Sequence, residues 1–138
     1  MQREEIIETL HRECCSCVIA NGDRVVLCHR RGVRDLAELL ESDPGLLDGA
    51  FIADKVVGKG AAALMVACRV SALHADVISE SALRLLRIAD VPVTYGRSVH
   101  SIINRAGTDI CPVEKLCADT DDPLTCVRMI REFLNQKS

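Results

Sequence analysis

The chain of 138 residues has the length of about one domain, and 49% of its residues are apolar while 27% are charged, so we predict a single globular domain over 1–138. A net charge of −3, one tyrosine, two phenylalanines and no tryptophan argue against nucleic-acid binding, because single-strand binders combine a basic surface with aromatic stacking platforms. No apolar run approaches the roughly 18 residues that a membrane span needs, so no membrane helix is expected.

The first thirteen residues carry early glutamates and have Ile6, Ile7 and Leu10 at helical spacing. A secretion signal would instead place a basic segment before an apolar one. The pattern therefore predicts an amphipathic helix over 1–13 that packs on the domain, in a cytoplasmic protein.

The next segment is rich in cysteine, which raises the question of a metal site. Cys14 and Cys17 form a CxxC motif, and Cys28 with His29 could complete a four-ligand zinc site. Structural zinc sites usually present two short-spaced pairs on turns, whereas Cys17 runs into a predicted strand and Cys28 ends the next one. We therefore expect Cys14, Cys15, Cys17 and Cys28 to be free thiols, with zinc binding as the alternative, and we expect no metal or cofactor.

Further elements follow in regular alternation. The segment 17–29 predicts a β-hairpin, because Asn21-Gly22 supplies the positive φ values of a type I′ turn. A helix is expected next, ended by Asp43-Pro44-Gly45. The expected helices are 35–42, 60–71, 80–90, a short one from Pro112, and 123–136; the expected strands are 49–54, 72–79 and 91–97; and 98–105 is a weak helix or a loop. Strands that alternate with helices predict a layered α/β sheet with parallel neighbours.

The stretch DKVVGKG joins a strand expected to end at Asp54 to a buried helix expected to begin near Gly60. Such junctions form the rim where α/β sheets bind ligands, so Asp54, Lys55 and Lys59 are candidate site residues. The Walker phosphate loop does not fit, because Ala53 stands where that motif needs a glycine and no Ser or Thr follows Lys59. Free N–H groups at the helix start predict an anion site, with close packing of the glycines as the alternative.

Two further motifs are expected on the same rim. Ser79 and Glu80 follow the next strand, where they could contact a ligand or cap the helix. Asn104 and Arg105 follow the last strand, where the arginine could bind a carboxylate or phosphate or brace a loop.

A possible nucleophile lies at the last of these motifs. Cys111 precedes Pro112 at an expected helix start, where the helix dipole lowers a thiol pKa. With Cys111 as nucleophile, Glu114 or Asp54 could shuttle protons. A half-buried structural cysteine before a helix-starting proline is the alternative.

The order of elements resembles the cytidine-deaminase-like fold, a three-layer α/β/α sandwich with a mixed sheet. The positions of its zinc signatures, His-x-Glu and Pro-Cys-x-x-Cys, here read GKGAA and ISESALRLL, so the resemblance implies no zinc deamination. The motifs DKVVGK, VISESAL and INRAGTDICPVEK closely resemble the domain of unknown function 1893 family, over 20–134. Deaminase-like domains commonly form oligomers, which implies a homodimer.

Two functional hypotheses follow. The first is a domain that binds a small anionic, nucleotide-like molecule through Lys59, Arg105 and helix amino ends. The second is a metal-independent enzyme that uses Cys111 as nucleophile. A vestigial pocket in a self-associating protein is a third alternative.

Overall fold

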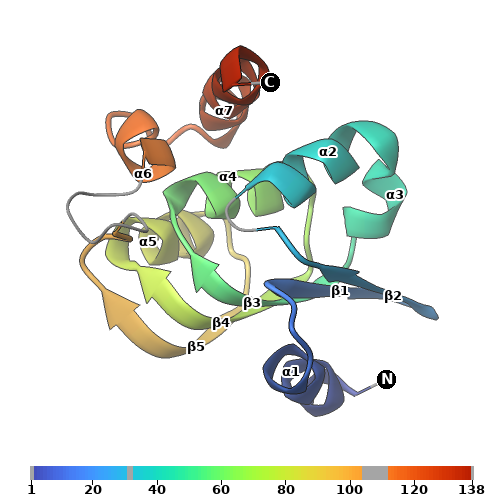
Figure 1. The fold of residues 1–138 in the computed structure, drawn as a ribbon. Helices are drawn as coiled ribbons and strands as arrows, with labels where there is room; N and C mark the ends of the chain where they lie inside the picture. Colours follow the sequence, from blue (N-terminus) through green and yellow to red (C-terminus); the bar gives the residue numbers. More distant parts are fainter. Residues whose placement is uncertain (1, 31–32, 104–111, 138) are drawn as a thin grey trace.

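The computed structural model describes residues 2–30, 33–103 and 112–137 and contains one five-stranded mixed sheet in the order β2-β1-β3-β4-β5 (Figure 1). Strand β1 is antiparallel to β2 and to β3, whereas β3, β4 and β5 are parallel to one another. The strand bounds are β1 Cys17–Asn21, β2 Arg24–Cys28, β3 Phe51–Val57, β4 Ala72–Ser79 and β5 Val93–Val99. The predicted α/β class with a mixed sheet is confirmed.

The predicted hairpin forms, but with a different turn. Asn21 pairs with Arg24, so the two loop residues are Gly22 and Asp23 rather than Asn21 and Gly22. Gly22 has a φ of +59°, whereas Asp23 does not have a positive φ. A positive φ at the first loop position alone is the pattern of a type II′ turn, so the predicted type I′ turn is wrong. The Asn21 side chain instead donates to the carbonyl oxygens of Leu46 and Asp48.

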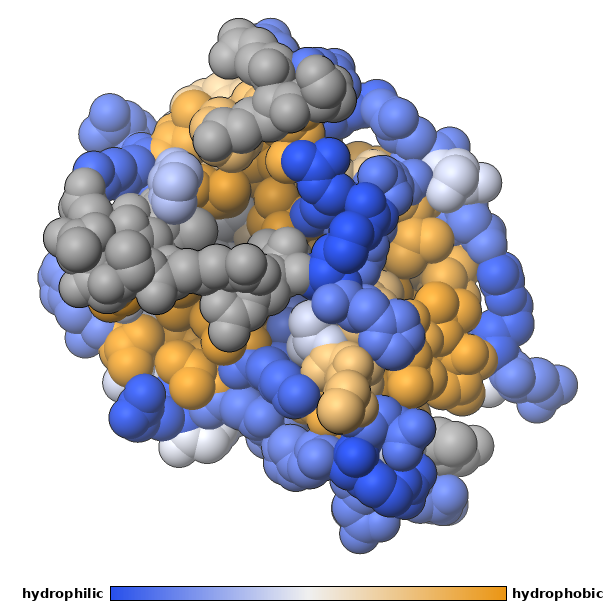
Figure 2. Space-filling view, in the orientation of Figure 1, coloured by the Kyte–Doolittle hydropathy of each residue, from blue (hydrophilic) through white to orange (hydrophobic). Residues whose placement is uncertain are grey.

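Helix α1 (Arg3–Arg12) covers one face of the sheet, below it in Figure 1. Its buried residues Ile6 and Leu10 pack with Val18, Phe51 and Ala53 in a small second core. The outer face of α1 is hydrophilic in the space-filling view (Figure 2). The helix is therefore amphipathic, as the spacing of its apolar residues predicted.

The other helices lie on the opposite face of the sheet (Figure 1). Their bounds are α2 Arg34–Ser42, α3 Pro44–Leu47, α4 Lys59–Ala67, α5 Glu80–Ile88, α6 Pro112–Leu116 and α7 Pro123–Lys137. The break at Asp43 is confirmed, and Pro44 opens a further short helix at a position where its missing N–H costs nothing. Within the described residues, no helix is long and apolar enough to cross a lipid bilayer.

Helix α4 occupies the centre of the molecule, where it contacts β3 of the sheet and packs against helices α5 and α7. The first seven residues, Lys59–Met65, are all buried, which explains a sequence that is apolar almost all round. The helix is shorter than predicted: it ends at Ala67, and Arg69 adopts a left-handed φ of +62°. Residues 68–71, which were predicted to be helical, form a turn that leads into β4.

Strand β3 is longer than predicted, which changes the position of one candidate residue. Val56 and Val57 continue the parallel pairing with Val77 and Ile78 of β4. Asp54 therefore lies within the strand and not at its end. The sequence expectation was wrong because an aspartate usually terminates a strand, whereas here it is held inside one by pairing on both sides.

Candidate functional site

The amino end of α4 meets the short helix α6 at the rim of the sheet. The backbone N–H of Lys59 donates to Glu114 Oε2 at 2.7 Å, and the N–H of Ile102 donates to Glu114 Oε1 at 3.3 Å. Glu114 is only 7% exposed. A helix amino end favours a negative charge, and here that charge is a carboxylate of the same chain.

The side chain of Lys59 is buried beneath the same rim. Its ammonium nitrogen lies 2.9 Å from Asp121 Oδ1 and 3.5 Å from the carbonyl oxygen of Ala118. The Lys59 ammonium lowers the pKa of the Asp121 carboxyl. Because the buried cation is paired within the chain, Lys59 connects α4 to the segment between α6 and α7.

The two glycines that flank Lys59 allow this close approach. A Cβ on Gly60 would lie 2.3 Å from Val113 Cγ1, well inside contact distance. A Cβ on Gly58 would lie 3.3 Å from Glu114 Oε2. The GKG sequence therefore permits tight packing against α6, which is the alternative that the sequence left open beside an anion site.

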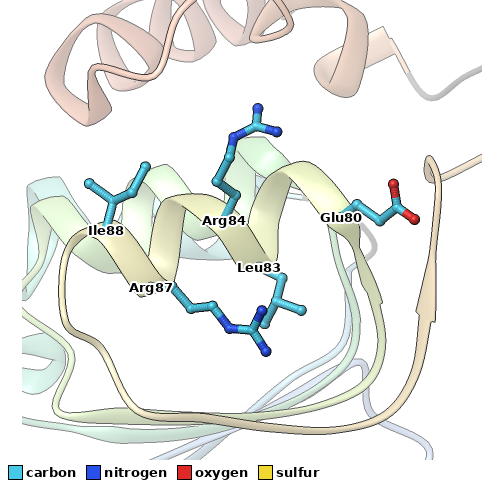
Figure 3. Close-up of a pocket in the computed structure, with 5 residues that line it drawn as sticks. All are labelled: Glu80, Leu83, Arg84, Arg87 and Ile88. Carbon is cyan, nitrogen blue, oxygen red and sulfur yellow. The ribbon is translucent and has the colours of Figure 1, made fainter.

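Ser79 and Glu80 lie where β4 ends and α5 begins, and they have different environments. Ser79 is fully buried and its hydroxyl accepts from the N–H of Ala82 at 3.2 Å, so it caps α5. Glu80 is exposed and directed toward the end of β5 (Figure 3).

A hollow of about 240 Å³ opens between α5, the end of β5 and α6, and we call it the rim hollow. It is lined by Glu80, Ser81, Arg84, His100, Ser101, Glu114, Lys115 and Ala118. Arg84 was not predicted from the sequence, although it lies four residues after Glu80 and hence on the same helix face. No spacing pattern in the sequence connects α5 with Lys115.

A second hollow of about 420 Å³ runs along α5 and shares Glu80 and Arg84 with the rim hollow. Leu83, Arg87 and Ile88 complete it. Figure 3 shows Arg84 extending from α5 toward α6 and α7, whereas Arg87 points toward the sheet. Arg84 Nη2 lies 3.6 Å from Asp121 Oδ1 in an exposed contact.

Asp54 and Lys55 do not line either hollow. Asp54 lies on the sheet face that carries the main core, and alternation along β3 places Lys55 on the α1 face. Burial raises the pKa of Cys15 on that face, and the charge of Lys55 opposes this shift. Burial raises the pKa of Asp54 to about 7, although hydrogen bonds from the N–H groups of Val56 and Lys55 act to lower it. The predicted rim set is therefore divided, with Lys59, Glu80 and Glu114 close to the rim hollow and Asp54 and Lys55 elsewhere.

The cysteines proposed as an alternative zinc site are also divided. Cys14 is exposed, Cys15 belongs to the core beneath α1, and Cys17 and Cys28 belong to the core on the opposite face. In the part of the chain that the structure describes, no three His, Cys, Asp or Glu side chains gather closely enough to hold a metal ion. Three candidates, Asn104, Arg105 and Cys111, lie outside the described residues.

Comparison with known proteins places the chain in a family. Residues 5–134 match the profile of a family described as Domain of unknown function (DUF1893). The crystal structure of a DUF1893 family protein from Thermotoga maritima is similar, with a TM-score of 0.86 and 25% sequence identity over 96% of this chain and 91% of that one. No curated protein matches. The chain therefore belongs to the DUF1893 family.

Proposed function

We propose that the protein binds a small phosphate- or carboxylate-bearing molecule in the rim hollow, on a cytidine-deaminase-like scaffold that lacks the zinc ligands of the deaminases. The polar lining of the hollow is the main support: it contains the cationic side chains of Arg84 and Lys115, and also His100, Ser81 and Ser101. His100 and Ser101 hydrogen-bond to each other at 3.1 Å. An arginine fork matches the geometry of a phosphate or carboxylate.

The acidic residues of the hollow are compatible with such a ligand. Both oxygens of Glu114 already accept backbone N–H groups, so its charge is partly neutralised. Glu80 is exposed at the opening, where its oxygens can accept hydrogen bonds from ligand hydroxyl groups, as a carboxylate does for ribose in dinucleotide sites.

The sizes of the two hollows suggest which part of the ligand each of them binds. The rim hollow of about 240 Å³ lies below the usual range of about 300 to 1,000 Å³ for complete ligand pockets and suits one charged group. The larger hollow shares Arg84 with it and carries Leu83 and Ile88, which can contact an apolar or planar ligand body. A nucleotide-like molecule has both parts.

A thermal-shift panel tests the proposal. It contains inorganic phosphate, nucleoside monophosphates, sugar phosphates and small carboxylates, each against wild type, Arg84→Gln and Arg87→Gln. A ligand at 100 times its dissociation constant adds about 2.7 kcal/mol of stability. We expect at least one compound to stabilise wild type and Arg87→Gln but not Arg84→Gln, because Arg84 lines both hollows whereas Arg87 lines only the larger one and points toward the sheet. Equal shifts in all three proteins, or no shift with any compound, would contradict the proposal.

A further inference from the structure

A second group of reactive side chains lies across the sheet, away from the rim hollow. Cys17 of β1 pairs directly with Cys28 of β2 on one side and with Asp54 of β3 on the other. Cys17, Cys28 and Ile52 belong to the same core cluster. Side chains alternate along β3, so Asp54, two residues after Ile52, lies on the same face of the sheet as Ile52. We call these three residues the sheet row.

The two thiols are placed for a disulfide. Direct partners in an antiparallel pair have Cα atoms about 4.5 to 5.5 Å apart, and disulfides join Cα atoms about 4.4 to 6.8 Å apart. Cys17 and Cys28 are free thiols that hydrogen-bond to each other. A bond between them therefore requires no change of register.

The same hydrogen bond makes the two thiols unequal. It lowers the pKa of Cys28, helped by the charge of Arg30 and opposed by burial. It raises the pKa of Cys17, together with burial and the nearby charge of Asp54. Cys28 is hence the attacking thiol, and Cys17 needs a proton acceptor before it can react.

Asp54 is a suitable acceptor because burial raises its pKa to about 7. The charged groups around the sheet row are Asp76 of β4, which raises the pKa of Asp54, and Asp35 of α2 and Arg30 after β2, which act on Cys28. Arg30 Nε lies 2.6 Å from Asp35 Oδ1, so these two charges largely offset each other.

We propose that Cys17 and Cys28 form a redox-active dithiol that reduces low-molecular-weight disulfides such as glutathione disulfide, with Asp54 as its proton acceptor. The Cys28 thiolate attacks one sulfur of the external disulfide, a mixed disulfide forms, and the first thiolate leaves. Cys17 then transfers its proton to Asp54 and attacks the Cys28 sulfur, which releases the second thiolate. The dithiol loses two electrons, the external disulfide gains them, and the two released thiolates take up the protons.

The position of Cys28 explains how a disulfide reaches a thiol that is 6% exposed. Strand β2 is at the edge of the sheet, and Cys28 is its last residue. Access to the thiol requires a local opening that breaks the two hydrogen bonds that the carbonyl oxygen of Cys28 accepts from Ser16, and such an opening does not require the rest of the sheet to unfold. His29 and Arg30 directly after it are exposed.

The chain contains its own control in Cys117 and Cys126. These two thiols are fully buried and also hydrogen-bond to each other. Burial raises the pKa of both, to about 12 for Cys117, so neither supplies an attacking thiolate. They should remain reduced while the sheet row is oxidised.

Mass spectrometry tests the proposal. The folded protein is equilibrated in glutathione buffers at pH 7.5, quenched with acid and alkylated before the measurement. In wild type and in Cys68→Ser we expect a Cys17–Cys28 crosslink and alkylated Cys117 and Cys126. In Cys17→Ser we expect a trapped mixed disulfide on Cys28. Two reduced, alkylated thiols at positions 17 and 28 in folded wild type would overturn the proposal.

The role of Asp54 is tested by the pH profile of crosslink formation. In wild type the rate should rise through an inflection near pH 7. In Asp54→Asn the release of the second glutathione should be at least about tenfold slower at pH 7.5, and the inflection should be absent. An unchanged profile in Asp54→Asn would refute Asp54 as the acceptor.

Discussion

Replacing Asp54 by asparagine should remove a specific pH dependence of stability. Asp54 is 8% exposed, and burial raises its pKa from 3.8 to about 7. Between about pH 4 and pH 7 the folded protein therefore keeps a proton that the unfolded chain releases, so the free energy of unfolding falls as the pH rises. Three pKa units at about 1.4 kcal/mol each give a loss of roughly 4 kcal/mol by pH 8.

Asparagine keeps the oxygen that accepts the N–H of Val56 at 3.3 Å but carries no charge. Wild type and Asp54→Asn should have similar free energies of unfolding at pH 4, and the variant should be more stable at pH 8 by roughly 4 kcal/mol. Urea denaturation of both proteins at a series of pH values measures this difference, in which the other titrating groups cancel. A difference that stays constant from pH 4 to pH 8, or a less stable variant at pH 8, would refute the reasoning.

Three substitutions test the rim and are measured by urea denaturation. Gly60→Ala places a Cβ 2.3 Å from Val113 Cγ1 and should cost about 1 to 3 kcal/mol of stability; a neutral effect would contradict the packing role of the glycine. Ser79→Ala removes the α5 cap and should cost about 1 kcal/mol; an unchanged stability would contradict the capping role. Glu114→Ala leaves the buried N–H of Lys59 without its acceptor and should cost about 1 to 3 kcal/mol; loss below about 0.5 kcal/mol would argue against this contact.

Much of the fold was predictable because local signals agreed with tertiary contacts. Strand β4 spans Ala72–Ser79, as its sequence predicted. The apolar run between turn residues favours a strand, and pairing with β3 and β5 stabilises that same segment. Helix α4 was expected to be buried, and its small and apolar residues are consistent with that position. These features depend on periodicity, which the sequence contains.

The errors fall where a tertiary contact overrides a local preference. Asp54 lies inside β3 because both neighbouring strands pair with it. The turn after Asn21 shifts by one residue because Asn21 pairs with Arg24 and its side chain donates to carbonyl oxygens near α3. Neither effect leaves a signal in the local sequence.

The candidate site was predictable only in part. The sequence suggested that Lys59, Glu80 and Glu114 share one rim, and they lie near each other there. It could not show that Glu114 accepts the N–H of Lys59, because the two residues are 55 positions apart and nothing in their spacing pairs them. The sheet row was missed for the same reason, since cross-strand register decides which cysteines face an aspartate.

Binding of an anion in the rim hollow can be measured residue by residue through NMR titration of the ¹⁵N-labelled protein. Inorganic phosphate and the strongest compound of the thermal-shift panel are added at constant ionic strength, with chloride as the control. We expect saturable amide shifts that centre on residues lining the hollow, and we expect their loss in Arg84→Gln. These residues are Ser81, Arg84, Ser101 and Lys115. Linear shifts equal to those with chloride, or saturable shifts that centre elsewhere in the chain, would contradict it.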